Sequence, residues 1–149
     1  GAGITGLYAN ASVNDAQRVQ AETLLNGVGS SVWVNDEDQL DAVTAVSGSG
    51  PAYYFLLMES MIESAQALGL DAQASRQLVV ETARGAALMA CEPDTDPATL
   101  RRNVTSPGGT TEAALNVMQA ENLGHIVDRA LLAAKQRAAT LATEFGSKT

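Results

Sequence analysis

The chain has 149 residues, of which 46% are apolar, and its formal net charge at pH 7 is −8. This length and apolar content exclude a disordered chain and allow a substantial core. The nine Lys and Arg residues are mostly scattered singly, so the charge argues against nucleic acid or an anionic membrane as a partner. No apolar run reaches the length that crosses a bilayer.

Cys91 is the only cysteine and His125 the only histidine. A lone cysteine forms no intrachain disulfide, which favours a cytoplasmic protein. No sequence feature pairs the two residues as nucleophile and base, and together they do not make a metal-ligand set, so we predict no metal site. The chain starts with neither an initiator methionine nor a signal peptide, and we expect it to be a segment of a longer protein.

Residues 1–35 predict a short strand-helix-strand segment. Its expected elements are a strand at 4–9, a helix that Asn14 or Asp15 caps and that Gly27 or Gly29 closes, and a strand at 31–34. This order is what the end of a Rossmann-type dinucleotide-binding domain would contribute.

The first six residues have the G-x-G-x-x-G spacing of a dinucleotide fingerprint. That fingerprint requires a strand before it, a helix that opens within it, and an acidic residue at the end of a second strand about twenty residues later. Here the glycines lead into a strand, and Glu22 lies inside a helical pattern. We therefore do not assign the cofactor phosphates to this stretch.

From residue 36 to the end the pattern is helical throughout, so we divide the chain into an α/β segment, 1–35, and an all-helical domain, 36–149. The expected helices are 37–46, 51–68, 72–91 with Asp71 as cap, 97–102, 110–119 and 124–145. The predicted fold class is mainly α.

The helix at 51–68 is apolar around almost its whole circumference from Tyr53 to Met58, and its first charge is Glu59. A helix that is apolar on all sides is buried on all sides. The other helices present mostly Ala and Gly, which make a thin core, so burial between two subunits is the favoured interpretation. A central helix in a monomeric bundle is the alternative.

Two Ser/Gly/Pro segments stand out. Ser47–Pro51 interrupts a helical pattern, and its glycines allow backbone or ligand to approach closely. Val104–Leu115 combines a hydroxyl-rich double-glycine turn with the start of an amphipathic helix, where free N–H groups favour a carboxylate or phosphate. An ordinary capped turn is the alternative. Arg101 and Arg102, just before it, either complement a helix C-terminus or attract substrate.

The residues Ala42–Tyr53 and Val104–Thr111, in this order and some fifty residues apart, resemble pyrroline-5-carboxylate reductase, the last enzyme of proline biosynthesis. The resemblance covers nearly the whole chain and includes Gly3–Tyr8, Val32–Val34 and Leu100–Arg101. It implies a helical C-terminal domain that interlocks with a second copy into a homodimer, possible further assembly into a ring of dimers, and a dinucleotide-binding domain of which this chain holds only the last part.

The resemblance also implies reduction of the C=N bond of 1-pyrroline-5-carboxylate to L-proline with NADP or NAD as cofactor. Its substrate-binding residues would be Val104, Ser106, Gly108, Gly109, Thr110 and Thr111. Ser106 and the amides from Gly109 onward would hold the carboxylate, Thr111 would lie by the ring nitrogen as the catalytic residue, and Thr110 is expected to cap the helix. Ser49, Gly50 and Pro51 would approach the nicotinamide.

Two other functions stay open at this stage. A related β-hydroxyacid-type dehydrogenase would carry a catalytic lysine on its central helix, and 51–68 has none. A helical oligomerisation module without catalytic duty would have no reason to keep the Ser106–Thr111 group of residues together.

Overall fold

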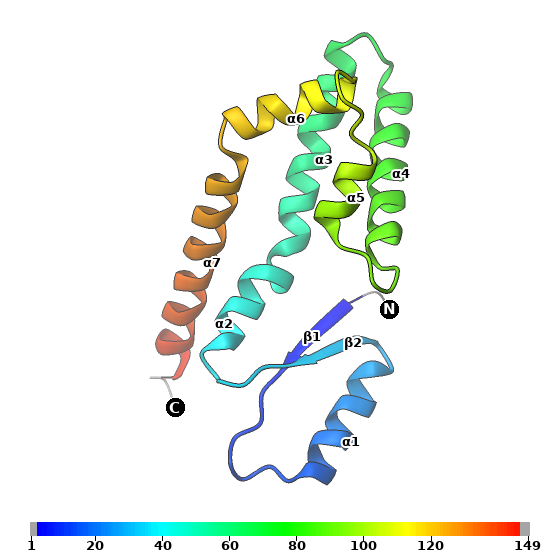
Figure 1. Ribbon diagram of the computed structural model, residues 1–149. Helices are drawn as coiled ribbons and strands as arrows, with labels where there is room; N and C mark the ends of the chain where they lie inside the picture. The colour runs from blue at the N-terminus through cyan, green and yellow to red at the C-terminus, as the bar shows by residue number, and fades with distance from the viewer. Residues whose placement is uncertain (1–2, 147–149) are drawn as a thin grey trace. The chain divides into compact units, whose positions relative to one another are not determined.

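The computed structural model describes residues 3–146 and contains seven α-helices, one π-helical turn and two strands within that range (Figure 1). Contacts between residues define two compact units. The first consists of residues 1–51 and 127–149, and the second of residues 52–126. The predicted division at residue 36 stays a prediction.

The first unit begins with a two-stranded parallel sheet. Strand β1, Gly3–Leu7, pairs with β2, Gly29–Trp33, so that Gly3 lies opposite Gly29 and Leu7 opposite Trp33. Parallel strands need a crossover between them, and helix α1, Asp15–Asn26, provides it and packs on β2.

Local sequence signals set the limits of α1. The Asn14 side chain accepts from the Gln17 N–H and the Gln17 side chain accepts from the Asn14 N–H, both at 3.0 Å, which is a complete capping box. Gly27 is the C-cap. The prediction of a cap at 14 or 15 and a closing glycine at 27 or 29 is confirmed.

Trp33 fixes α1 against β2. Its indole Nε1 donates to Glu22 over 3.3 Å, and the Arg18 guanidinium lies 4.5 Å from the ring centre. Both partners are on α1, one turn apart, so Trp33 on the strand contacts the helix at two successive turns.

After β2 the chain enters helix α2, Gln39–Val43, and continues through the π-helical turn η1, Thr44–Gly48, into α3, Gly50–Ala67. The Ser49 N–H donates to the Thr44 carbonyl, five residues back, at 2.9 Å. Pro51 has no N–H and its ring would clash with a carbonyl of a regular α-helical turn before it. The interruption predicted at 47–51 is therefore a widened helical turn rather than a loop.

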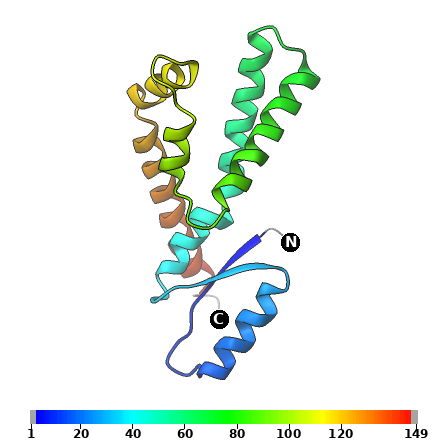
Figure 2. The ribbon, with the colours of Figure 1, turned by 45° about the vertical axis from the view of Figure 1, so that its right-hand side comes forward.

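The second unit contains most of α3, then α4, Ala72–Ala90, α5, Pro97–Asn103, and α6, Thr110–Ala120. The turn between α3 and α4 includes Gly69 with φ of +100°, and Asp71 caps α4 by accepting from the Ala74 N–H at 2.8 Å. The two helices run antiparallel, as both ribbon views show (Figures 1 and 2). Helix α5 packs on α4.

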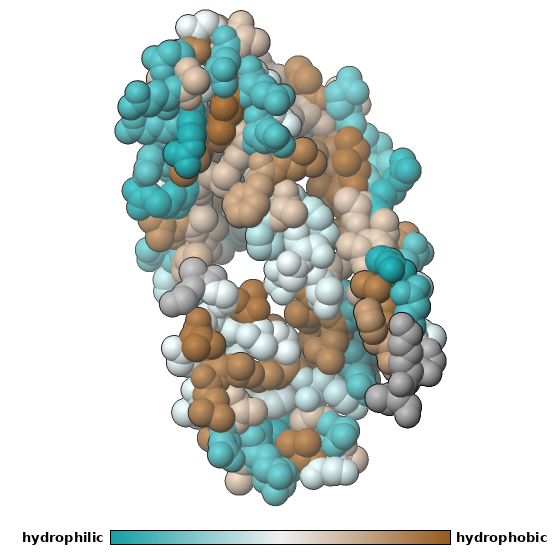
Figure 3. Space-filling model, turned by 180° about the vertical axis from the view of Figure 1, so that it is seen from behind, coloured by the Kyte–Doolittle hydropathy of each residue, from teal (hydrophilic) through white to brown (hydrophobic). Residues whose placement is uncertain are grey.

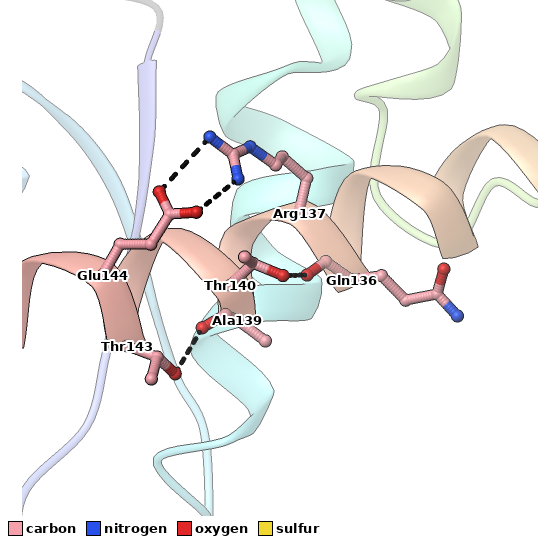
Figure 4. Close-up of polar contacts among 6 residues, drawn as sticks. All are labelled: Gln136, Arg137, Ala139, Thr140, Thr143 and Glu144. Atoms are coloured by element: carbon pink, nitrogen blue, oxygen red, sulfur yellow. Dashed lines mark hydrogen bonds and ion pairs between the residues drawn. The ribbon is translucent and has the colours of Figure 1, made fainter.

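Helix α7, Leu123–Gly146, is the last element. Near its end Arg137 forms a two-pronged ion pair with Glu144, two turns further along, with N···O distances of 3.0 and 3.4 Å (Figure 4). Both side chains are more than half exposed. Such a surface pair contributes about 0.2–1 kcal/mol, and because both residues belong to α7 it stabilises the helix itself and ties it to no other element.

Few apolar side chains are buried in the single chain. Among the described residues, Ala45 and Val79 are the only buried hydrophobic ones, and hydrophobic side chains lie open to solvent over the helices (Figure 3). On α3, Tyr54 is 67% exposed and Phe55 65%. An open groove between α3 and α4 is lined by the apolar side chains of Phe55, Met58, Ile62 and Val80 together with Glu59 and Glu63.

The mainly α fold class with a short parallel sheet is confirmed, and so are the six helices expected after residue 36, within a few residues and with the first of them formed by α2 and η1. Among the described residues, no helix combines the length and the apolar character that a membrane span requires.

Candidate functional site

Helix α5 leads into the segment that the sequence singles out. Asp96 is its N-cap and accepts from the Thr99 N–H at 2.9 Å and from the Thr99 hydroxyl at 3.0 Å. These hydrogen bonds hold the pKa of the Asp96 carboxyl below its ordinary value. Val104 is the C-cap and is 59% exposed.

Residues 106–109 form a tight turn. The Gly109 N–H donates to the Ser106 carbonyl at 3.0 Å, Pro107 follows at the second position, and Gly108 has φ of +71° at the third. Proline followed by a residue with positive φ defines a type II turn. A Cβ on Gly109 would lie 3.0 Å from the Ser106 carbonyl oxygen, which is a tight contact, so the turn favours glycine at both positions.

Helix α6 begins directly after this turn, and its N-cap is Gly109, which makes no side-chain hydrogen bond. The expectation that Thr110 caps the helix was wrong, because Thr110 is the first helical residue. The Gly109 N–H, expected among the carboxylate donors, is already used within the turn.

Several hydrogen-bond donors of this segment remain available to a ligand. In the part of the chain that the structure describes, the N–H groups of Thr110 and Thr111 make no hydrogen bond, and neither do the hydroxyls of Ser106, Thr110 and Thr111. Two N–H groups at a helix N-terminus together with hydroxyls next to them can bind a small anion.

Sequence reasoning missed one residue of this segment. The Glu112 carboxylate accepts from the Gly108 N–H at 2.7 Å. An acidic residue three positions after a helix N-cap is the usual signal for a capping box, and here the carboxylate reaches one residue further back because Gly109 is already bonded.

The basic pair before the turn lies in the last turn of α5. Arg102 donates to the Thr99 hydroxyl at 2.6 Å and so belongs to the hydrogen bonds around the Asp96 cap. Cations at this end of a helix complement its dipole.

The second predicted group, Ser49, Gly50 and Pro51, lies in the first unit, where the π-helical turn joins α3. Gly50 is buried, yet a Cβ there would meet no atom within 4 Å. The close approach that glycine permits is therefore not used by another element of the chain.

The described residues do not fit the phosphates of a dinucleotide. Gly3 and Gly6 lie within strand β1, and the connection from β1 to α1, residues 8–14, contains no glycine. The first two residues of the fingerprint-like stretch lie outside the described residues. Between residues 3 and 146, no three His, Cys, Asp or Glu side chains gather as metal ligands.

A two-stranded parallel sheet with its crossover helix, followed by helices with exposed apolar side chains and a donor-rich turn, defines a mainly α chain with a short α/β start. The model of the pyrroline-5-carboxylate reductase dimerisation family matches residues 37–141. The chain belongs to this family.

Relatives of known name support the same family assignment. The chain is 54% identical over 144 residues to the pyrroline-5-carboxylate reductase of Pseudomonas aeruginosa, which covers 97% of this chain and 53% of the relative. The solved structure of the Coxiella burnetii enzyme superposes with a TM-score of 0.91 at 46% identity, over 94% of this chain and 52% of that one. The Plasmodium falciparum enzyme with NADP bound gives 0.77 at 30% identity, over 89% and 51%. The chain spans about half the length of the relatives it matches.

Proposed function

We propose that this chain is the substrate-binding and dimer-forming half of a pyrroline-5-carboxylate reductase, which reduces 1-pyrroline-5-carboxylate to L-proline. The single observation that carries the proposal is the cluster of unbonded donors from Ser106 to Thr111 in a chain of this family. A molecule with a carboxylate next to a ring nitrogen matches this mixture of N–H groups and hydroxyls.

The carboxylate of the substrate would bind the N–H groups of Thr110 and Thr111 and the Ser106 hydroxyl. Preorganised N–H groups at a helix start stabilise a negative charge without reorganising. Val104, which is largely exposed just before the turn, would pack against the ring. Gly108 and Gly109 allow the tight turn that brings these groups together.

The Thr111 hydroxyl would lie at the ring nitrogen and hydrogen-bond to it as the imine becomes an amine. A threonine of ordinary acidity is a weak proton donor by itself, so its contribution is to orient the ring and to stabilise the nitrogen in the transition state. The nitrogen receives its proton from solvent or reacts as the already protonated imine.

A nicotinamide, NADPH or NADH, supplies the hydride when bound. The Plasmodium falciparum relative is solved with NADP, which supports this assignment. Residues 3–14 do not fit the cofactor phosphates. The phosphates would therefore bind to a part of the full protein that corresponds to the half of the relatives that this chain does not match. Ser49, Gly50 and Pro51 would approach the nicotinamide where the π-helical turn joins α3.

We also propose that two copies of the helical part interlock, with further assembly into a ring of dimers. Burying a large apolar side chain gains about 1.5–3 kcal/mol, and Tyr54, Phe55, Leu56 and Leu57 all lie at least half exposed on α3 alone. Covering this surface with a second copy would provide the core that one chain lacks.

A fusion tests the activity. Joining the dinucleotide-binding part of the Pseudomonas aeruginosa relative to this chain should give NAD(P)H-dependent reduction of 1-pyrroline-5-carboxylate, followed as loss of absorbance by the cofactor. The 149-residue chain alone should give none. Turnover by the chain alone would contradict the assignment of cofactor binding to the other part of the fusion. An inactive but folded fusion would favour an oligomerisation module without a catalytic role.

Light scattering tests the assembly, and we expect a dimer or larger at micromolar concentration. Leu57→Arg should dissociate or unfold it, because an unpaired charge in an apolar interface costs several kcal/mol. Leu24→Arg is the matched control, since Leu24 is 69% exposed on α1, outside the family match. A folded wild-type monomer would exclude the interlocked dimer.

A further inference from the structure

One hydrogen bond at the proposed site involves Glu112, a side chain that has no role in the proposed function. The carboxylate of Glu112, on the first turn of α6, accepts a hydrogen bond from the Gly108 N–H at 2.7 Å. Gly108 is the residue of the turn with φ of +71°. An anionic side chain therefore lies in the segment that is proposed to bind an anion, and it occupies one of the N–H groups there.

This contact gives a partner to the N–H group of Gly108, between Pro107 and Gly109. The Gly109 N–H donates to the Ser106 carbonyl, Pro107 has no N–H, and Glu112 takes the Gly108 N–H. The N–H groups of Gly108 and Gly109 are then both used, and the next ones along the chain, those of Thr110 and Thr111, are left for a ligand. Glu112 is only half-buried, so its place is set by this hydrogen bond rather than by packing.

We propose that Glu112 is a positioning residue for the substrate carboxylate. By holding Gly108, its carboxylate keeps the turn in the conformation that points the Ser106 hydroxyl and the Thr110 and Thr111 N–H groups toward one anion. The proposal rests on the proposed function, since it assumes that these groups bind the carboxylate. In this role Glu112 raises the affinity for the substrate carboxylate, whereas its negative charge alone would lower that affinity.

Three variants of the 149-residue chain separate the two effects, with L-proline as the probe in calorimetric titrations. Glu112→Ala should bind L-proline roughly tenfold more weakly, the effect of losing one charge-assisted hydrogen bond. Glu112→Gln should bind at least as tightly as the wild type, because its amide oxygen accepts the same N–H without the opposing negative charge. Glu121→Ala, at the other end of α6, removes the same charge and should leave binding unchanged.

Hydrogen exchange of the Gly108 amide, measured by NMR, reports the contact itself. Exchange should be slow in the wild type and in Glu112→Gln and fast in Glu112→Ala. Unchanged or tighter binding by Glu112→Ala, or failure of Glu112→Gln to restore binding, would overturn the positioning role while the proposed function stands. No binding of L-proline by the wild type would overturn the proposed function, and this inference with it.

Discussion

The two Ser/Gly/Pro segments of this chain, residues 47–51 and 106–109, have similar composition and very different backbones. In the first, Ser49 donates five residues back and the helical path continues through a π turn. In the second, Gly108 takes φ of +71° and the chain turns sharply between α5 and α6.

The position of each proline relative to its helix explains the difference. Pro51 is the second residue of α3, where a missing N–H is tolerated and a widened turn before it avoids the ring clash. Pro107 comes after α5 has ended and is followed by a glycine with positive φ, which is the combination for a type II turn. The first segment therefore leaves its helix continuous, and the second leaves donors without partners.

The largest effect should come from the chemistry assigned to the second segment. In the fusion protein, Thr111→Ala should lower kcat/KM about ten- to hundredfold, because a hydrogen bond to a charged group is worth about 1.5–3 kcal/mol. Thr110→Ala keeps its backbone N–H and should lower it less. If Thr110→Ala is the damaging change and Thr111→Ala is silent, the assignment along the turn is wrong by one residue.

A pair of glycine substitutions tests the backbone difference directly. Gly108→Ala should destabilise the chain by about 1–2 kcal/mol, because φ of +71° strains any residue with a Cβ. Gly48→Ala should stabilise it by about 0.5–1 kcal/mol, because alanine favours helix. The new methyl would make an ordinary 3.6 Å contact with Thr44. Urea unfolding at one fixed protein concentration measures the change in the free energy of unfolding for both variants. Changes of the same sign in the two variants would contradict the comparison.

The smallest effect concerns the helix that leads into the second turn. Asp96→Ala removes the cap of α5 and should lower the free energy of unfolding slightly at pH 7. Because the pKa of Asp96 is lowered in the folded state, its contribution is complete above the unfolded pKa of about 3.9 and disappears as the pH falls through the lower folded value. Urea unfolding at neutral and strongly acidic pH should show the difference vanish in acid, with Asp128→Ala on α7 as control.

Much of the local structure follows from short-range chemistry. Asn14, Asp71 and Asp96 cap their helices where a short polar side chain precedes an apolar periodicity, and each cap is present in the structure. The turn at Pro107 and Gly108 follows from two residues whose backbone preferences admit few alternatives. Such features depend on neighbours within about four residues, so the sequence alone predicts them.

Other features depended on competition between neighbours. Thr110 was expected to cap α6, but Gly109 is the N-cap because its N–H closes the turn onto Ser106. The π turn before Pro51 was expected as an interruption, since composition does not show whether a helix breaks or widens around a proline. Glu112 carried the capping-box spacing, and only the folded turn decided that Gly108 would be its partner.

The sequence by itself determined the order of elements, the caps of α1 and α4, the two glycine-proline segments and the apolar character of α3, because each depends on local preference or periodicity. The tertiary structure decided which donors at the second turn are already bonded, and that few apolar side chains of the described residues are buried within one chain. Both depend on which groups from separate positions come into contact, and no local pattern contains that information.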